Sequence, residues 1–455
     1  MHKFLPVVVI AFLFTNSCSF IPELGAVRFP VSRKFPGDTT GAVPPDIAWR
    51  KFFTDPRLRV LVETALANNS DLRTAVLNVE RSRAQYAISR SGLFPGVFGT
   101  GSAERSRRLQ NGGAATANNY ELKVGMTSYE LDLFGRIHSL NQSALNRFLA
   151  TDAGRVGVQI SLVAEVASQY ITERALLEQI EVAGQTRDGM NAAYDIMLRR
   201  RDAGTVSDVE MSSVEVQRQT AEADLAAFRQ QLRQINNSLV FLTSGSLPSS
   251  LPKGRSLDDQ IVADVRAGTP SDLLWRRPDI REAEFQLRSA NADIGAARAA
   301  YFPRVTLTAE GGIASNRFSN LFSNGTGTFN FNPQISVPIF AGARLDANLD
   351  VAEISKKIEI VNYQKAIQNA FREVADGLAG RSGLAAQIAA NERLVEAQRK
   401  RAQLATSRYD QGVDSYFEVL TAMLDHYAAR QRLIQLRMAR EINSVSLYKA
   451  LGGGW

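Results

Sequence analysis

Few residues of this 455-residue chain are suited to catalysis. It contains three histidines and one cysteine, which excludes a Cys/His zinc cluster and a disulfide scaffold. Asp425 and His426 are adjacent, but no third ligand lies near them in the sequence, so a surface histidine is favoured over a metal site. Glu130 and Asp132 could form a catalytic acid pair, although they also suit the end of a strand. With no phosphate-binding glycine loop or serine nucleophile motif, we expect neither an enzyme nor a bound metal or cofactor.

Charge and composition exclude further classes. The chain is 45% hydrophobic and 22% charged, which is typical of a folded protein rather than a disordered one. Its 53 Lys and Arg residues against 46 Asp and Glu residues give a formal net charge of +7. Because this excess is small and scattered, we do not expect a nucleic-acid partner. The length allows two or three ordinary domains or one large elongated one.

The first residues are typical of an export signal. Lys3 belongs to a short basic start, and the apolar run from Phe4 to Phe14 is too short to span a bilayer. We therefore expect residues 1–17 to be a signal peptide. Cys18 follows directly and resembles the lipidated residue of a bacterial lipobox, although it could also lie beside an ordinary cleavage site. Lipidation would anchor the mature chain, and Ser19 in the next position favours the outer membrane.

The chain contains an internal duplication. The motif at Asp71 recurs at Asp279, 208 residues later, and the Asp-x-Gly turn ending at Gly204 recurs at Gly412 with the same offset. We therefore expect two repeats, residues 71–245 and 279–455, the second with a C-terminal tail. Four prolines indicate that residues 246–278 are the connector, and residues 18–70 would form a lipid-anchored N-terminal segment.

Each repeat is expected to contain a helix, two strands, a very long helix and a last helix. Proline is absent between Pro95 and Pro248 and after Pro338. This permits continuous helices over about 139–202 and 345–409, and the first would be roughly 96 Å long at 1.5 Å per residue. Apolar residues recur at alternating spacings of three and four, which is typical of a left-handed coiled coil. The predicted fold is therefore mainly helical, with a small strand-forming part.

Apolar and polar residues alternate in segments 120–126, 304–309 and 329–339, around Gly/Asn/Ser-rich tips near 109–119 and 316–328. Such segments are typical of outer-membrane strands, although an ordinary sheet on a soluble core has the same period. No run of 18 apolar residues occurs after residue 18, so a membrane crossing would require these strands. Four strands cannot close a barrel, so the barrel would be shared between copies; two chains would give eight strands and three would give twelve.

Five motifs carry a family resemblance, which covers essentially the whole mature chain. They are Arg277-Pro278-Asp279-Ile280, Ala292-Asp293-Ile294-Gly295, Phe302-Pro303, Tyr409-Asp410-Gln411-Gly412 and the terminal Ala450-Leu451-Gly452-Gly453-Gly454-Trp455. Together they resemble the outer-membrane factors of bacterial tripartite efflux pumps, the TolC-like proteins, and more closely their OprM/NodT-type lipoprotein branch. This resemblance implies a homotrimer with a twelve-stranded β-barrel and a long α-helical coiled-coil tube that projects into the periplasm.

The resemblance implies a passive exit duct and three kinds of partner besides the chain itself. These are a periplasmic adaptor (a membrane fusion protein), an inner-membrane pump of the RND type, and outer-membrane lipid. The alternative from another class is a periplasmic coiled-coil scaffold or adaptor lipoprotein. An adaptor would show one helical hairpin flanked by β-rich lipoyl-type domains, whereas two hairpins and two strand pairs are expected here. A lipid-anchored hydrolase lacks a nucleophile and base.

The resemblance also implies a gate at the periplasmic end of the tube. By position, Tyr409 and Asp414 would help to tether the second helical hairpin to neighbouring helices. Gly204 and Gly412 mark the two turns at which the hairpins would meet the adaptor.

The constriction itself is implied to lie just after the second turn. Phe417 falls where OprM-like members place an apolar ring, and Glu418 falls where TolC has an acidic residue. Thr421 departs from the family, whose members commonly have an aspartate there. Phe417, Leu420 and Leu424 also have the spacing of a helix packing stripe, so the residues by themselves leave a core role for Phe417 open.

Overall fold

The computed structural model describes residues 19–25, 31, 32, 35, 48–110, 113–245, 247, 250–259, 261–263 and 274–453. The predicted signal peptide and Cys18 lie outside the described residues. Two short helices, α2 (Trp49–Phe52) and α3 (Pro56–Asn68), precede the repeated elements.

The helices repeat along the chain with a constant offset. The pairs are α4 (Ser70–Ser91) with α8 (Pro278–Ala299), α5 (Arg136–Asp202) with α9 (Arg344–Asp410), and α6 (Asp208–Leu242) with α10 (Tyr416–Ala450). Their lengths are 22, 67 and 35 residues in both copies, and corresponding ends lie 208 positions apart. Val163, Val166 and Tyr170 of α5, which have the alternating spacing of three and four residues, are buried. The predictions of a duplicated, mainly helical chain with very long helices are therefore confirmed.

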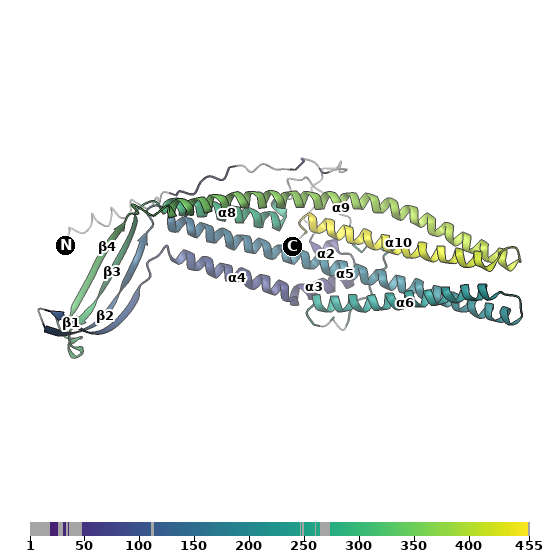
Figure 1. The fold of residues 1–455 in the computed structure, drawn as a ribbon, viewed down its shortest axis with the longest axis horizontal. Helices are drawn as coiled ribbons and strands as arrows, with labels where there is room; N and C mark the ends of the chain where they lie inside the picture. Colours follow the sequence, from purple (N-terminus) through teal and green to yellow (C-terminus); the bar gives the residue numbers. More distant parts are fainter. Residues whose placement is uncertain are drawn as a thin grey trace. The chain divides into compact units, whose positions relative to one another are not determined.

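The chain divides into two compact units, each built from separate stretches of sequence. The first contains the described residues of Met1–Arg28, Asn78–Asp152 and Glu282–Lys365, and the second contains those of Phe29–Leu77, Ala153–Arg281 and Ala366–Trp455. The second unit holds α6 and α10 with the parts of α5 and α9 that begin at Ala153 and Ala366, and it therefore contains the turns of both helical hairpins, which Figure 1 shows in teal and in green to yellow. No helix in the described part of the chain is both long and apolar enough to cross a membrane.

The first unit contains one antiparallel sheet of four strands. The strands are β1 (Phe98–Gln110), β2 (Gly113–Leu131), β3 (Arg304–Ser315) and β4 (Gly327–Ser336), and they pair in that order (Figure 1). A 3-10 turn, Phe318–Asn320, lies between the last two strands. The strands β1 and β4 are the sheet edges, so each has one side of its backbone that pairs with no other described strand.

One face of this sheet is apolar. Cross-strand register aligns Val124, Gly311 and Phe329, and likewise Met126, Ala309 and Phe331. The other face carries polar and charged residues, namely Glu121, Lys123, Thr308, Glu310, Asn330 and Asn332. Because successive side chains alternate between faces, the predicted polarity pattern produces a two-sided sheet.

A bulge in β2 keeps the apolar face continuous. The register with β3 shifts between Met126 and Tyr129, and Ser128 has a φ of 54°. The extra residue moves the apolar positions from even numbers (Leu122, Met126) to odd numbers (Tyr129, Leu131) without changing the face. A strand without the bulge would turn one of these groups to the polar side.

Two strand details differ from the prediction. The β1–β2 ladder continues to Gln110 and Gly113, so most of the expected tip at 109–119 is paired strand. The strand β4 ends at Ser336 rather than near residue 339, and Pro338, which has no amide hydrogen, lies two residues further along the chain.

The N-terminal residues lie against the end of α8 in the first unit. The ring of Phe20 stacks on Phe302 with centroids 4.7 Å apart, and Asn291 donates a hydrogen bond to the Pro22 carbonyl at 2.7 Å. A Cβ atom on Gly295 would come within 2.6 Å of Ile21 Cγ1 and 2.7 Å of Ser139 Oγ. Glycine at this motif position therefore allows the N-terminal segment to cross the helix closely.

The second unit has a polar centre around Asp55. This fully buried carboxylate accepts hydrogen bonds from the Tyr170 hydroxyl at 2.7 Å and from the Arg255 amide at 2.8 Å, and it caps α3 through Arg57 N. Burial, followed by the hydrogen bond to Asp55, raises the pKa of Tyr170. Because Arg255 lies in the predicted connector, these bonds attach the connector to α3 and α5.

Candidate gate at the helix turns

The α5–α6 and α9–α10 hairpins turn at the two predicted glycines. Gly204 and Gly412 have φ values of 72° and 73°, a region that residues with a Cβ atom rarely adopt. In the first turn, Thr205 N donates to Arg200 O at 2.9 Å and Gly204 N donates to Arg201 O at 2.8 Å. The second turn repeats this pattern, so both long helices end in a Schellman motif.

The helices that follow the turns begin differently. Ser207 and Glu210 form a reciprocal capping box at the start of α6, whereas the corresponding Ser415 makes no side-chain capping bond at the start of α10. The hydrogen bond from the Ser207 amide lowers the pKa of Glu210. Glu418, which corresponds to Glu210, is exposed and has no ion-pair or hydrogen-bond partner for its side chain among the described residues. Its carboxylate is therefore free to face solvent or another chain.

An apolar cluster packs the four helices together behind the turns. It combines residues of α5, α6, α9 and α10, and Met197, Val214, Val419 and Ala422 are almost completely buried in it. This cluster fixes the direction in which the first turn of α10 presents its side chains.

Tyr409 joins the two hairpins. Its hydroxyl accepts a hydrogen bond from Arg200 Nη1 of α5, and the Arg200 guanidinium lies 5.0 Å from the Tyr409 ring centroid. The same ring meets Tyr416 edge-on with centroids 5.0 Å apart. Burial, followed by the proximity of Tyr409, raises the pKa of Tyr416 to about 12. Tyr409 thus connects α9 to the neighbouring hairpin and to the apolar cluster.

Asp414 is held within its own hairpin. Its two carboxylate oxygens accept from Arg408 Nε at 2.5 Å and from Arg408 Nη2 at 2.9 Å, across the turn. These hydrogen bonds lower the pKa of Asp414. The bidentate pair fixes the conformation of the turn, and in this chain it joins Asp414 to α9 rather than to a neighbouring hairpin.

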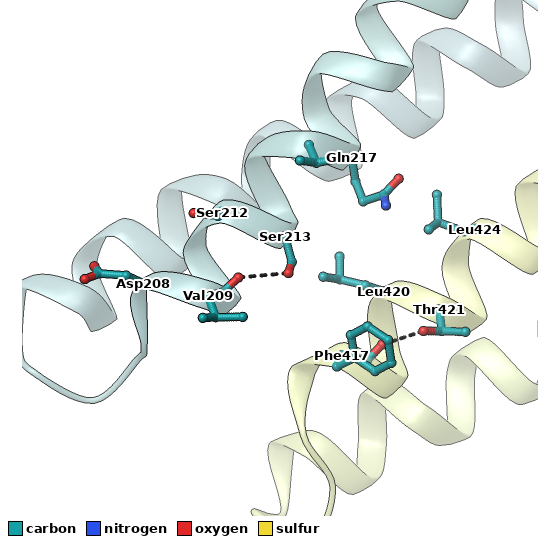
Figure 2. Close-up of a pocket in the computed structure, with 10 residues that line it drawn as sticks. Asp208, Val209, Ser212, Ser213, Gln217, Phe417, Leu420, Thr421 and Leu424 are labelled. Carbon is teal, nitrogen blue, oxygen red and sulfur yellow. Dashed lines mark hydrogen bonds between the residues drawn. The ribbon is translucent and has the colours of Figure 1, made fainter.

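A groove of about 470 Å³ lies between the first turns of α6 and α10. We call it the hairpin groove; its lining residues are Asp208, Val209, Ser212, Ser213, Val216, Gln217, Phe417, Leu420, Thr421 and Leu424. Figure 2 shows Phe417 and Thr421 on one side, with Val209 and Ser213 on the other. The Thr421 hydroxyl donates to Phe417 O at 2.9 Å, so it does not extend into the groove as a free donor. Glu418 does not line the groove.

The predicted packing stripe on α10 is divided by this groove. Leu420 is 4% exposed and belongs to the apolar cluster, whereas Phe417 is 61% exposed. Within this chain Phe417 is therefore a surface residue, and its ring is available to solvent or to a neighbouring chain.

The sequence motifs identify neither the α6 side of the groove nor the roles of Arg200 and Arg408. Val209, Ser213 and Val216 lie 208 positions before Phe417, Thr421 and Leu424, so the groove is built from equivalent faces of the two repeats. The 208-residue repeat offset relates Phe417 to this α6 face. No comparable signal identifies Arg200 and Arg408 as the partners of Tyr409 and Asp414.

Comparison with known proteins extends over nearly the whole chain. The family model described as outer membrane efflux protein matches residues 61–245 and again 269–453. The antibiotic efflux pump outer membrane protein ArpC of Pseudomonas putida is 40% identical over 99% of this chain and 95% of its own length. The cation efflux system protein CusC of Escherichia coli is 37% identical over 97% of this chain and 96% of its own length.

A solved structure agrees with both the fold and the family. The open state of the MtrE outer membrane channel of Neisseria gonorrhoeae has a TM-score of 0.88 and 37% sequence identity, covering 96% of this chain and 98% of that one. The two matched segments of the family model start 208 residues apart, in agreement with the structural repeat. The chain therefore belongs to the outer membrane efflux protein family, as its motifs predicted.

Proposed function

We infer that this chain forms the outer-membrane exit duct of an efflux system. The observation that carries this inference is the four-stranded sheet, which has one continuous apolar face and two unpaired edges, in a chain that matches the family over both repeats. A transport duct needs no catalytic group, and the family is one of transport channels rather than enzymes. The chain is accordingly an outer-membrane component of an efflux pump, which works with adaptor and inner-membrane pump partners.

The open sheet edges support a trimer. If β1 of one chain pairs with β4 of the next, three sheets close a twelve-stranded barrel in which no strand edge faces lipid. The apolar face would then contact lipid, and the polar face with Glu121, Lys123 and Glu310 would line the lumen. The helical hairpins would continue as a tube into the periplasm.

The N-terminal packing supports lipid anchoring at Cys18. Phe20 and Ile21 lie against the end of α8, next to the start of β3 at Arg304. Acyl chains attached directly before Ser19 would start from the end of the sheet at which the helices join it. That end is the periplasmic side of the proposed barrel, where a lipoprotein anchor enters the inner leaflet.

The turn geometry supports a gate at the periplasmic end. The Arg200–Tyr409 bond holds the α9–α10 hairpin against α5, and the Arg408–Asp414 pair holds its turn. Release of these contacts would allow the hairpin to move and to displace Phe417, Glu418 and Thr421. The turns at Gly204 and Gly412 would meet the adaptor, and the OprM/NodT-type resemblance implies an inner-membrane pump of the RND type.

The choice of transported molecules differs between relatives of this chain, as their names indicate. Its relatives of nearly equal identity are named for antibiotics in one case and for cations in the other. We therefore propose that small molecules pass unselected and that the inner-membrane pump chooses them.

Single-channel conductance of the purified trimer in a planar bilayer tests the proposal. We expect small currents for the wild type and larger currents for Phe417→Ala/Glu418→Ala, because the exposed ring and carboxylate no longer narrow the duct. The control is Val209→Ala, which changes the first-repeat equivalent of Phe417, leaves the Ser207–Glu210 capping box intact and should alter conductance less. A monomer that stays soluble after removal of lipid and conducts in no form would support the scaffold alternative instead.

A further inference from the structure

The β1–β2 hairpin extends beyond the rest of the sheet. The strand β2 pairs with β3 only from Tyr120 onward, and residues before Tyr120 pair only with β1. Residues 104–110 and 113–119 therefore form a two-stranded ribbon, which we call the distal ribbon. It lies at the opposite end of the strands from their connections to the helices, so in the proposed barrel it is on the extracellular side.

Two arginines of this ribbon lie on the apolar side of the sheet. The register places Ala103 opposite Tyr120, Arg105 opposite Asn118 and Arg107 opposite Thr116. Tyr120 has the parity of Leu122 and therefore shares the apolar face, and so do its cross-strand partner and every second residue of β1. On that face β1 carries only small residues, Gly99, Gly101 and Ala103, until the two arginines begin.

The spacing places these arginines at the outer boundary of the apolar face. Asn118 and Thr116 lie two and four residues beyond Tyr120, which corresponds to about 7 and 13 Å along the strand. The apolar face on β2 runs from Leu131 to Tyr120, about 36 Å along the strand, and a tilt of about 40° reduces this to nearly the 25 Å apolar band of an outer-membrane barrel. Arg105 and Arg107 are thus at head-group height in the outer leaflet.

The two guanidinium groups are available for binding. Both side chains are exposed, and neither has a hydrogen-bond or ion-pair partner within the described ranges. The carboxylate nearest in sequence, Glu104, lies on the opposite face, as does Arg108. No described residue therefore compensates the positive charge on the lipid-facing side.

We propose that Arg105 and Arg107 bind the phosphate groups of lipopolysaccharide in the outer leaflet. Guanidinium groups bind phosphate oxygens with paired hydrogen bonds, and two of them at i and i+2 present this chemistry side by side. Six arginines per trimer would surround the barrel at this height. The proposal rests on the membrane barrel proposed above and adds the class of lipid that it selects.

Binding of purified lipopolysaccharide to the detergent-solubilised full-length trimer tests this proposal, with Arg105→Gln/Arg107→Gln as the variant. Removal of each cation is expected to weaken binding about fivefold, and removal of both about 25-fold. Arg108→Gln is the matched control, because it removes an adjacent arginine that faces the lumen, and it should change binding less than twofold. The difference should largely disappear in 1 M salt, where the screening length is about 3 Å.

Binding experiments with other lipids identify the chemical group that the two arginines recognise. Enzymatically dephosphorylated lipopolysaccharide should bind wild type and the double variant equally, and phosphatidylethanolamine should not distinguish them. An equal loss in Arg108→Gln and in the double variant, or undiminished binding of the dephosphorylated lipid, would overturn the proposal. If phosphatidylglycerol showed the same difference in binding between wild type and the double variant, the proposed selectivity for lipopolysaccharide would be contradicted. Trimer assembly and conductance are measured separately, so their failure would be distinguishable as a failure of the duct itself.

Discussion

Replacing Tyr409 with phenylalanine removes one hydroxyl from the contact between the hairpins. The phenyl ring can still take the Arg200 guanidinium at about 5.0 Å and meet Tyr416 edge-on. Only the hydrogen bond from Arg200 Nη1 is lost. Hydrogen bonds to charged groups contribute about 1.5–3 kcal/mol, and solvent screening of this exposed pair reduces the value to about 1 kcal/mol.

This loss is multiplied if the three chains of the proposed trimer open together. About 1 kcal/mol changes an equilibrium roughly fivefold, and three simultaneous losses change it roughly 100-fold. We therefore expect Tyr409→Phe to shift the gate towards the released state and to raise single-channel conductance or open probability in a planar bilayer. A change of roughly 100-fold would indicate concerted opening of the three chains, and a change of roughly fivefold would indicate that each hairpin moves independently.

Tyr194→Phe provides the control. The Tyr194 ring lies 4.3 Å from the Arg218 guanidinium, and its hydroxyl has no hydrogen bond among the described residues. This variant should conduct like the wild type. Unchanged conductance in Tyr409→Phe, or an equal increase in Tyr194→Phe, would show that the Arg200–Tyr409 bond does not hold the gate.

Three further outcomes are expected. Gly295→Ala should lower the free energy of unfolding by roughly 1–3 kcal/mol, because the added Cβ would overlap Ile21. Gly184→Ala is the control, because its Cβ would enter open space, and it should raise the free energy of unfolding by about 0.5–1 kcal/mol. Equal effects of the two variants in thermal unfolding would contradict the close crossing at Gly295. Ser207→Ala should weaken the first turn of α6 by about 1 kcal/mol, and Ser415→Ala should leave the first turn of α10 unchanged in hydrogen exchange, since only Ser207 forms a capping bond. The pKa of Asp414 is lowered in the folded chain, so its contribution is present above the unfolded value of about 4 and is lost as pH falls through the lowered value. The difference in Tm between wild type and Asp414→Asn should accordingly vanish at low pH, and a difference independent of pH would exclude the ion pair as its cause.

Most of the fold can be predicted from the amino-acid sequence because its determinants are local and repeated. The absence of proline permits two 67-residue helices, glycine with positive φ ends each of them, and polarity alternation defines the two faces of the sheet. The 208-residue offset then relates the two halves element by element. These features depend on backbone stereochemistry or on the period of a single element. None of them requires knowledge of contacts between residues that are distant in sequence.

Local patterns were insufficient where two outcomes are close in energy. Ser207 and Ser415 are both followed three residues later by glutamate, yet only the first pair forms a capping box. The alternation in β2 also gave no indication of the bulge at Ser128, which depends on pairing with β3. A capping bond of about 1 kcal/mol is readily outweighed by tertiary packing of the same turn.

Local sequence patterns are enough to define the duplication, the long helices, the turns and the two-faced strands. The folded chain shows in addition that Tyr409 bonds to Arg200, that Asp414 pairs with Arg408, and that Phe417 lies exposed on a groove shared with α6. The first set of features depends on residues that are near one another along the chain. Most of the second set depends on helices that are about 200 residues apart in sequence and meet only when the apolar cluster packs them side by side.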